Sequence, residues 1–222
     1  MSRFEPTAKT KLRRLPKRGA FDRKTVEDIL DAGFVAHVGF VDGGQPFVLP
    51  MIYGRDGGMV YLHGSAGGRH LRALAAGGNI CVTVTVVDGL VLARSAFHHS
   101  MNYRCVVVLG RAEKVSDQTQ KLRALEIISE HVLPGRWQDA RKPNAAEMKQ
   151  TLVVALPLSE CSAKIRTGPP LDEEEDYSLP IWAGVVPMKT VFGAPAADLR
   201  LAAGGRVPDY LKKALASHGC GN

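Results

Sequence analysis

Two short glycine turns constrain this chain more than any other local feature. Each of the tripeptides Asp42-Gly43-Gly44 and Asp56-Gly57-Gly58 separates stretches in which β-branched and aromatic residues are common. Glycine reaches the left-handed backbone conformations that tight hairpin turns require, and Asp-Gly pairs are typical of such turns. The sequence therefore predicts three consecutive antiparallel strands, at 34–41, 45–55 and 59–63.

Further apolar patterns extend this plan along the chain. Additional strands are predicted at 79–87, 90–94, 103–115 and 151–158, whereas 159–189 is rich in loops. Helices are predicted at 23–32, 69–76, 117–132, 145–149 and 207–217, the first of them capped by Asp22. About six strands joined by tight turns, with few helices, are typical of a closed antiparallel β-barrel with helices outside it. The expected fold class is mainly β.

The size and composition of the chain limit the number of domains. With 222 residues, 45% hydrophobic and 23% charged, it can form one sizeable core. We expect a barrel domain at 19–190, between a flexible basic arm at 1–18 and an extension with a short helix at 191–222. None of the apolar runs approaches the about 20 residues that a membrane helix needs, so no membrane partner is expected.

Cysteine usage and the N-terminal composition indicate the compartment. The four cysteines are scattered without C-x-x-C spacing, at positions Cys81, Cys105, Cys161 and Cys220. This pattern predicts free thiols in a reducing environment, and neither a disulfide framework nor a zinc site. Residues 1–18 lack the apolar stretch of a secretory signal. We therefore expect a cytoplasmic protein.

The net charge of +7 is concentrated at one end of the chain. Residues 1–18 hold seven basic residues and one acidic residue, which leaves a net charge of only +1 for the other 204 residues. A folded basic face is therefore not predicted, and nucleic-acid binding is an unfavoured function class. The arm is either solvated, in contact with a polyanion, or packed along an acidic surface such as the run 172–176.

A strand–loop–helix junction at 59–72 is a candidate phosphate site. The strand runs into the loop 64–68, which is rich in glycine and serine, and Arg69 stands in the first turn of the following helix. Backbone N–H groups at a helix start favour an anion, whereas an arginine there is unfavourable for the helix alone. The junction is either a phosphate-binding loop or a solvated turn that holds an arginine.

Two further segments are dense in polar groups. The loop 95–104 either faces water or lines a polar pocket, because such groups are costly to bury without partners. Its adjacent His98 and His99 point to opposite faces of an extended chain, so no metal site is predicted. Lys164 and Arg166 share one face and can meet an anion or the acidic run 172–176. Trp182 is either a stacking partner for a planar ring or a core residue.

The sequence resembles the flavin-nucleotide-binding branch of the pyridoxamine 5′-phosphate oxidase-like proteins, and also the related nitroimidazole-resistance proteins. The resemblance spans about residues 14–187, and the run 88–104 is its most specific part. The other matching segments are 17–23, 37–40, 61–65, 134–137, 162–166 and 182–184. The resemblance implies the FMN-binding split-barrel fold, six-stranded, antiparallel and Greek-key-like.

The resemblance also implies a homodimer that holds two flavins, FMN or alternatively FAD, in the cleft between its subunits. Arg69 falls where such proteins place a basic residue on the flavin phosphate, although Gly68 stands where many relatives have serine. The loop 98–104 and Trp182 are expected to approach from the partner subunit. The implied cofactor-binding residues are Pro50, Met51, Ile52, His63, Gly64, Ser65, Arg69, Thr83, Thr85, His99, Arg104, Lys164 and Trp182.

The expected function is that of a flavin-dependent oxidoreductase, a reductase or oxidase of a small-molecule substrate. His63 is the first candidate for a proton donor or substrate clamp and Tyr103 the second, while a purely structural hydrogen bond is the alternative for His63. The arginine-rich C-terminal segment of the vitamin B6 oxidases is missing, so oxidation of pyridoxamine phosphate itself is not expected. The alternative function is a non-enzymatic module that binds flavin, haem or deazaflavin on the same barrel.

Overall fold

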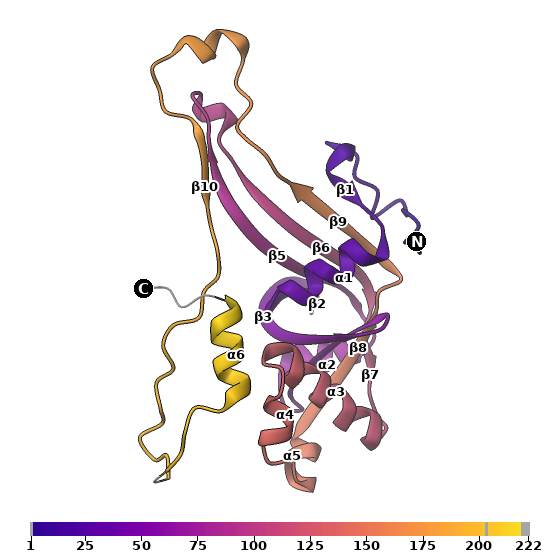
Figure 1. The fold of residues 1–222 in the computed structure, drawn as a ribbon. Helices are drawn as coiled ribbons and strands as arrows, with labels where there is room; N and C mark the ends of the chain where they lie inside the picture. The colour runs from indigo at the N-terminus through magenta and orange to yellow at the C-terminus, as the bar shows by residue number, and fades with distance from the viewer. Residues whose placement is uncertain (1, 203, 219–222) are drawn as a thin grey trace.

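The computed structural model describes residues 2–202 and 204–218, and Figure 1 shows its fold. Within these residues a ten-stranded antiparallel sheet follows the order β1-β9-β6-β5-β2-β3-β4-β8-β7, and β10 pairs with β5 outside this path. The strands are β1 (Gly19–Ala20), β2 (Val35–Asp42), β3 (Gln45–Asp56), β4 (Met59–Ser65), β5 (Asn79–Leu92), β6 (Ser100–Arg111), β7 (Glu113–Lys114), β8 (Thr151–Pro157), β9 (Glu160–Arg166) and β10 (Gly184–Pro187).

The mainly β fold class is confirmed, with more strands than the sequence predicts. The hydrogen-bonded order is open, since its ends are β1 and β7. However, β6 leads through Ala112 directly into β7, which pairs with β8. The chain itself thus completes a ring of β5, β2, β3, β4, β8 and the continuous β6–β7 segment, which is the architecture of a split barrel.

The helices lie outside the sheet, as predicted (Figure 1). They are α1 (Arg23–Ala32), α2 (Arg69–Ala75), α3 (Gln118–Val132), α4 (Arg136–Asp139), α5 (Ala145–Gln150) and α6 (Asp209–His218). Asp22 accepts a hydrogen bond from the Thr25 N–H at 2.8 Å and caps α1, and Asp117 caps α3 in the same way. Helix α3 lies very close to β3, because a Cβ atom on Gly54 would stand 2.7 Å from the Ile128 backbone.

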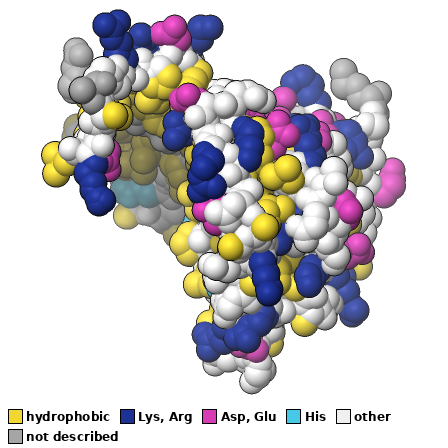
Figure 2. Space-filling model, turned by 90° about the horizontal axis from the view of Figure 1, so that it is seen from below, with side chains coloured by type: hydrophobic (Ala, Val, Ile, Leu, Met, Phe, Trp, Pro, Cys, Tyr) yellow, Lys and Arg dark blue, Asp and Glu magenta, His cyan; other side chains and the backbone are white. Residues whose placement is uncertain are grey.

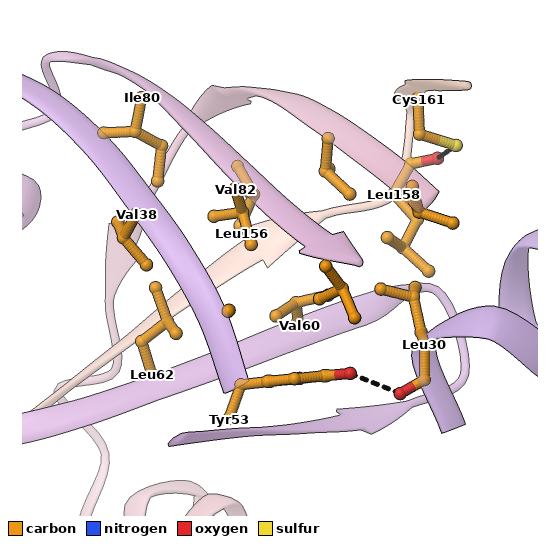
Figure 3. Close-up of a cluster of buried hydrophobic side chains, with 14 of the residues drawn as sticks. Leu30, Val38, Tyr53, Val60, Leu62, Ile80, Val82, Leu156, Leu158 and Cys161 are labelled. Carbon is orange, nitrogen blue, oxygen red and sulfur yellow. Dashed lines mark hydrogen bonds between the residues drawn. The ribbon is translucent and has the colours of Figure 1, made fainter. Parts of the chain in front are cut away.

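The core fills the barrel and the space beneath α1. Alternate side chains of the strands point inward, and the fully buried residues include Val38, Val82 and Leu156 (Figure 3). Val26, Ile29 and Leu30 of α1 are buried against the same cluster. The Tyr53 hydroxyl donates to the Leu30 carbonyl, so the buried phenol has a partner inside the core (Figure 3).

A long arm extends from the barrel. It consists of the outer parts of β5 and β6 together with β9 and β10, and the short helical turns η2 (Ala96–His98) and η3 (Glu174–Ser178) lie near its tip (Figure 1). The two strands predicted at 79–87 and 90–94 form the single strand β5, in which the register shifts between Val87 and Gly89. The region 159–189, expected to be rich in loops, contributes β9 and β10.

The N-terminal arm packs on the barrel for part of its length. Phe4 is only 6% exposed and joins the core cluster, and its N–H donates to the Phe21 carbonyl at 2.8 Å. Glu160 of β9 accepts hydrogen bonds from Thr7 at 2.6 Å and from Lys9 at 3.1 Å. The acidic partner of this arm is therefore Glu160, not the run 172–176 considered from the sequence.

The C-terminal extension returns along the barrel. It descends from β10 and ends in α6, which lies beside α4 (Figure 1). Phe192 contacts Phe34, with ring centroids 5.8 Å apart. Cys220 lies outside the described residues. Of the helices in the described part of the chain, none is long and apolar enough to span a membrane.

Candidate functional site

One face of the sheet is largely uncovered within the described chain, except at one end, where the segment that follows β10 lies beside it. We call it the outer sheet face, and it comprises Val35, His37, Val41, Val48, Pro50, Ile52, Thr83 and Thr85. These residues face outward because their neighbours Ala36, Val38, Val82 and Val84 point into the core. Val41 and Val48 are 60% and 65% exposed. Such an exposed apolar surface is typical of an interaction or ligand-binding site.

The outer sheet face brings together four of the implied cofactor-binding residues. His37 of β2 pairs with Pro50 on one side and with Thr83 on the other, so these three side chains form a row. Ile52 and Thr85 lie on the same face, two positions along their strands. The side chain of Met51 points the other way and packs against the core, so only its backbone belongs to this face.

A cavity of about 380 Å³ opens between this face and the C-terminal extension. Its lining includes His37 and Thr85 from the sheet and Met188 to Thr190 from the segment that follows β10. Figure 2 shows a recess with hydrophobic side chains and a histidine on the side of the molecule seen from below. On that side, Lys and Arg are spread among acidic residues, and no single basic patch is visible (Figure 2).

The loop at the start of α2 has the predicted strand–loop–helix form. The Ser65 side chain accepts a hydrogen bond from the Gly67 N–H at 3.2 Å, and Gly68 stands at the N-cap position without a side-chain cap. The Arg69 guanidinium lies 4.6 Å from the centre of the Phe47 ring and 3.6 Å from the Asp42 carboxylate. It is largely exposed and turned toward the hairpin between β2 and β3.

A larger pocket lies between β4 and the helices α3, α4 and α5, and we call it the α3–α5 pocket. Its volume is about 570 Å³. The lining residues are Ile52, His63, Leu125, Ile128, Ser129, Val132, Leu133, Arg136, Trp137, Arg141, Pro143, Glu147 and Thr151. The lining combines apolar side chains with one imidazole, one indole, two guanidinium groups, one carboxylate and two hydroxyl groups. Sequence patterns did not reveal this pocket.

His63 is the polar group that marks this pocket. Its Nδ1 atom is buried and has no hydrogen-bond partner among the described residues. Burial lowers the pKa of His63, because the charged imidazolium loses its hydration. The structural hydrogen bond considered as an alternative for His63 is not seen at Nδ1 among the described residues, so the buried Nδ1 is a polar atom without a partner beside this pocket.

The two arginines of the α3–α5 pocket differ in how their donors are used. Arg141 donates to both carboxylate oxygens of Glu147, at 2.7 and 3.1 Å, and this pairing lowers the pKa of Glu147 to about 2. Arg136 bonds through Nη1 to Tyr210 at 3.0 Å and to Asp139 at 3.4 Å. In the described part of the chain, Nε and Nη2 of Arg136 have no hydrogen-bond acceptor.

The remaining candidate residues lie on the arm, apart from the loop before α2. Arg104 forms a bidentate pair with Asp88, with distances of 2.7 and 2.9 Å. His99 bonds to the Ala93 carbonyl at 3.1 Å, and Tyr103 is partly buried opposite Arg166 of β9. Trp182 is 66% exposed, so it is not a core residue of the described chain.

Lys164 and Arg166 have separate environments on β9. Lys164 is partly buried opposite Cys105, whereas Arg166 is buried and donates to Asn102 and to the carbonyl groups of Gly168 and Pro169. Neither pairs with the acidic run within the described chain. The run instead supplies Asp172 to Arg94, a partner that sequence spacing did not suggest. Groups of three or more metal-binding side chains are not found among the described residues.

The comparison with family models decides the family. The model described as pyridoxamine 5′-phosphate oxidase matches residues 22–165, which is more than half of the chain. The chain belongs to this family. The resemblance inferred from the sequence is therefore confirmed, and the match covers the barrel from the start of α1 to the end of β9. No curated protein matches.

Solved structures extend the similarity beyond the part that the family model covers. The chain is 41% identical to the flavocytochrome Anf3 from Azotobacter vinelandii, with a TM-score of 0.89 over 98% of this chain and 100% of that one. It is 35% identical to the FAD- and haem-binding protein from Mycobacterium smegmatis, with a TM-score of 0.84 over 88% of this chain and 96% of the other.

A third structure is similar over a smaller part of the chain. A Bacteroides thetaiotaomicron protein assigned to 5-nitroimidazole antibiotic resistance is 26% identical, with a TM-score of 0.55. The match covers 65% of this chain and 84% of that one. These relatives support flavin binding by the family fold, which is the coarser part of the function expected from the sequence.

Proposed function

We propose that this protein is a redox protein that binds a flavin nucleotide on the outer sheet face and a haem in the α3–α5 pocket. The observation that carries the haem assignment is His63, whose buried Nδ1 has no partner in the described chain at a partly apolar pocket of about 570 Å³. Support also comes from the two relatives that match almost the whole chain, one a flavocytochrome and the other FAD- and haem-binding.

The residues of the α3–α5 pocket fit a haem chemically. A haem presents a flat apolar ring, an iron that accepts an imidazole ligand and two carboxylates. Ile128, Val132 and Leu133 supply apolar walls, and His63 supplies the imidazole. Arg136 supplies positive charge for a carboxylate, whereas Arg141 is already paired with Glu147. We therefore assign His63 as the haem ligand, in place of the proton-donor role expected from the sequence.

The outer sheet face fits a flavin in a complementary way. An isoalloxazine ring has apolar faces and a polar edge, and Thr83, Thr85 and His37 offer hydrogen-bonding groups in the row beside Pro50 and Ile52. We propose FAD as the bound form, because a relative 35% identical is named for FAD. FMN, the form expected from the sequence, is the other outcome of the cofactor test below.

We further propose that the outer sheet face is covered by a second copy of the chain. Val41 and Val48 of this face are 60% and 65% exposed, and the arm carries exposed apolar side chains such as Leu90, Phe97 and Trp182. In a two-fold dimer, the arm of each subunit can reach the flavin of the other. Arg104, His99 and Trp182 are proposed to approach the flavin in this way.

When bound, a flavin exchanges one or two electrons and a haem exchanges one, so the pair suits stepwise electron transfer to a small acceptor. In this chain, Ile52 belongs to both the outer sheet face and the lining of the α3–α5 pocket. Because the Ile52 side chain points outward and borders both, the two proposed sites lie next to each other on the outer side of the sheet. We propose oxidoreductase activity on this basis, with a flavin-only oxidoreductase as the alternative.

The test is to purify the protein with its native cofactors and record absorbance and released-cofactor mass. We expect a flavin band together with a sharp haem band near about 400 nm, and FAD rather than FMN by mass. The His63→Ala variant should lose the haem band and retain the flavin. The matched control is His98→Ala on the arm, which should retain both. A wild-type protein that takes up no haem would refute the haem assignment and leave the flavin-only alternative.

A further inference from the structure

Helix α6 docks on the wall of the α3–α5 pocket through one tyrosine. The Tyr210 hydroxyl accepts a hydrogen bond from Arg136 Nη1 at 3.0 Å and donates one to the Asp139 carboxylate at 2.8 Å. Arg136 and Asp139 are the two ends of α4. The C-terminal extension thus holds the short helix that presents Arg136 to the pocket.

The junction between α3 and α4 is shaped to receive this tyrosine. Gly135 has a φ of +90°, and a Cβ atom at this position would stand 2.9 Å from the Cβ atom of Tyr210. Glu130 of α3 accepts hydrogen bonds from the N–H groups of Gly135 at 2.6 Å and Trp137 at 2.7 Å. Helix α4 is therefore fixed by Glu130 at its start and by Tyr210 along its side.

Of the two arginines that line the α3–α5 pocket, Arg136 has unused hydrogen-bond donors within the described residues. Arg141 is engaged with both oxygens of Glu147, whereas Arg136 bonds through Nη1 alone within the described residues. A guanidinium has five N–H donors, so Nε and Nη2 can serve a further carboxylate. Tyr210 and Asp139 restrict the Arg136 side chain on one side and leave the other N–H groups for a ligand.

The share of the chain that each relative matches also indicates a role for the C-terminal extension that carries α6. The family model ends at residue 165, before the extension that carries α6. The flavocytochrome and the FAD- and haem-binding protein match 98% and 88% of this chain, whereas the nitroimidazole-resistance relative matches 65%. The extension is thus outside the common barrel, and similarity over nearly the full chain accompanies the relatives named for a cytochrome or for haem.

We propose that α6 completes the haem site, with Tyr210 as a positioning residue that holds Arg136 to bind a haem carboxylate at the mouth of the α3–α5 pocket. This inference rests on the haem assignment above. A charged hydrogen bond to a carboxylate depends on geometry, and a fixed side chain loses less entropy on binding. Removal of the Tyr210 hydroxyl leaves Arg136 present but held only by its longer bond to Asp139.

The test compares full-length wild type with the Tyr210→Phe and Arg136→Ala variants, each freed of haem and titrated with haem or haem dimethyl ester. Absorbance of the bound haem gives each affinity. We expect the wild type to prefer haem over its ester, Arg136→Ala to lose that preference, and Tyr210→Phe to weaken haem binding roughly threefold to thirtyfold with little effect on the ester. The double variant should be no weaker than Arg136→Ala alone.

The control is Tyr177→Phe on the arm, which should leave both affinities unchanged. Equal losses for haem and ester in Tyr210→Phe would show general packing damage and overturn the positioning role, and so would an unchanged preference in Arg136→Ala. A variant with an altered melting temperature is judged by the ratio of the two affinities, which does not depend on the folded fraction. A wild type that binds neither compound overturns the haem assignment itself, and this inference with it.

Discussion

The carboxylate of Asp172 accepts hydrogen bonds from the Arg94 N–H at 2.9 Å and the Ser95 N–H at 3.1 Å, and it also pairs with the Arg94 guanidinium at 3.2 Å. The Asp172 side chain is fully buried at this place. The guanidinium of Arg94 in turn lies 4.9 Å from the centre of the Tyr177 ring. This pair fastens the segment after β9 to the end of β5, and so fixes the far part of the arm.

Replacement of Asp172 by asparagine should loosen the arm without unfolding the barrel. The asparagine amide has the same shape as the carboxylate but carries no charge. Its NH₂ group cannot accept a hydrogen bond, so one of the donors that Asp172 now satisfies loses its partner. We expect limited proteolysis at 167–183 to become several times faster, with the melting temperature of the barrel almost unchanged. Asp176→Asn, in the same acidic run, is the control. Unchanged proteolysis would show that other contacts hold the arm.

Removal of the Phe4 ring should destabilise the barrel. Phe4 is 6% exposed, belongs to the core cluster and lies under the Arg23 guanidinium at 4.7 Å. Phe4→Ala is therefore expected to lower the free energy of unfolding by about 3 kcal/mol, measured by chemical denaturation. Phe97→Ala is the matched control, since Phe97 is 88% exposed and its loss should change the free energy of unfolding by less than about 0.5 kcal/mol in a monomer.

The contrast between these features shows what sequence patterns can predict. The hairpins and the caps of α1 and α3 are local, so Gly43, Gly57 and Asp22 indicate them directly. Phe4 is one apolar residue among basic ones and has no periodic pattern, although it reaches the core. Asp172 and Arg94 are 78 positions apart, and only the return of the chain along the arm brings them together.

Of the two candidate sites, the outer sheet face could be predicted in part from the sequence, whereas the α3–α5 pocket could not. The alternation of Thr83 and Thr85 predicts a shared face, and the outer sheet face confirms that they lie together. The α3–α5 pocket needs residues of three helices and of the strands β3, β4 and β8 to meet, and no spacing along the chain encodes this. The interpretation of His63 as a site residue came from the family resemblance, whereas its pocket became visible only in the fold.

Acid should destabilise the protein through His131. The pKa of His131 is lowered, mainly because burial removes the hydration of the charged imidazolium. The hydrogen bond to the Gly33 carbonyl and the charge of Asp31 oppose this shift, whereas the charge of Arg55 adds to it. Because the unfolded chain then binds more protons, the contribution of His131 to stability is complete above about pH 6.5 and declines as the pH falls from there toward the lowered pKa. Denaturation of the wild type and His131→Gln at several pH values should show a weaker decline in the variant. Equal slopes would exclude His131 as the cause.

The outer sheet face gives the test of assembly. Val48 is 65% exposed on this face, and a carboxylate there would have to be buried without a partner if a second copy covers it. Val48→Asp should therefore yield a monomer in sedimentation experiments and lose most of the bound flavin, because binding and dimerisation are linked. Leu199→Asp adds the same charge at a fully exposed residue of the C-terminal extension and should remain dimeric and flavin-loaded. If Val48→Asp stays dimeric with its flavin in place, another surface forms the dimer, and the proposed cover of the outer sheet face is wrong.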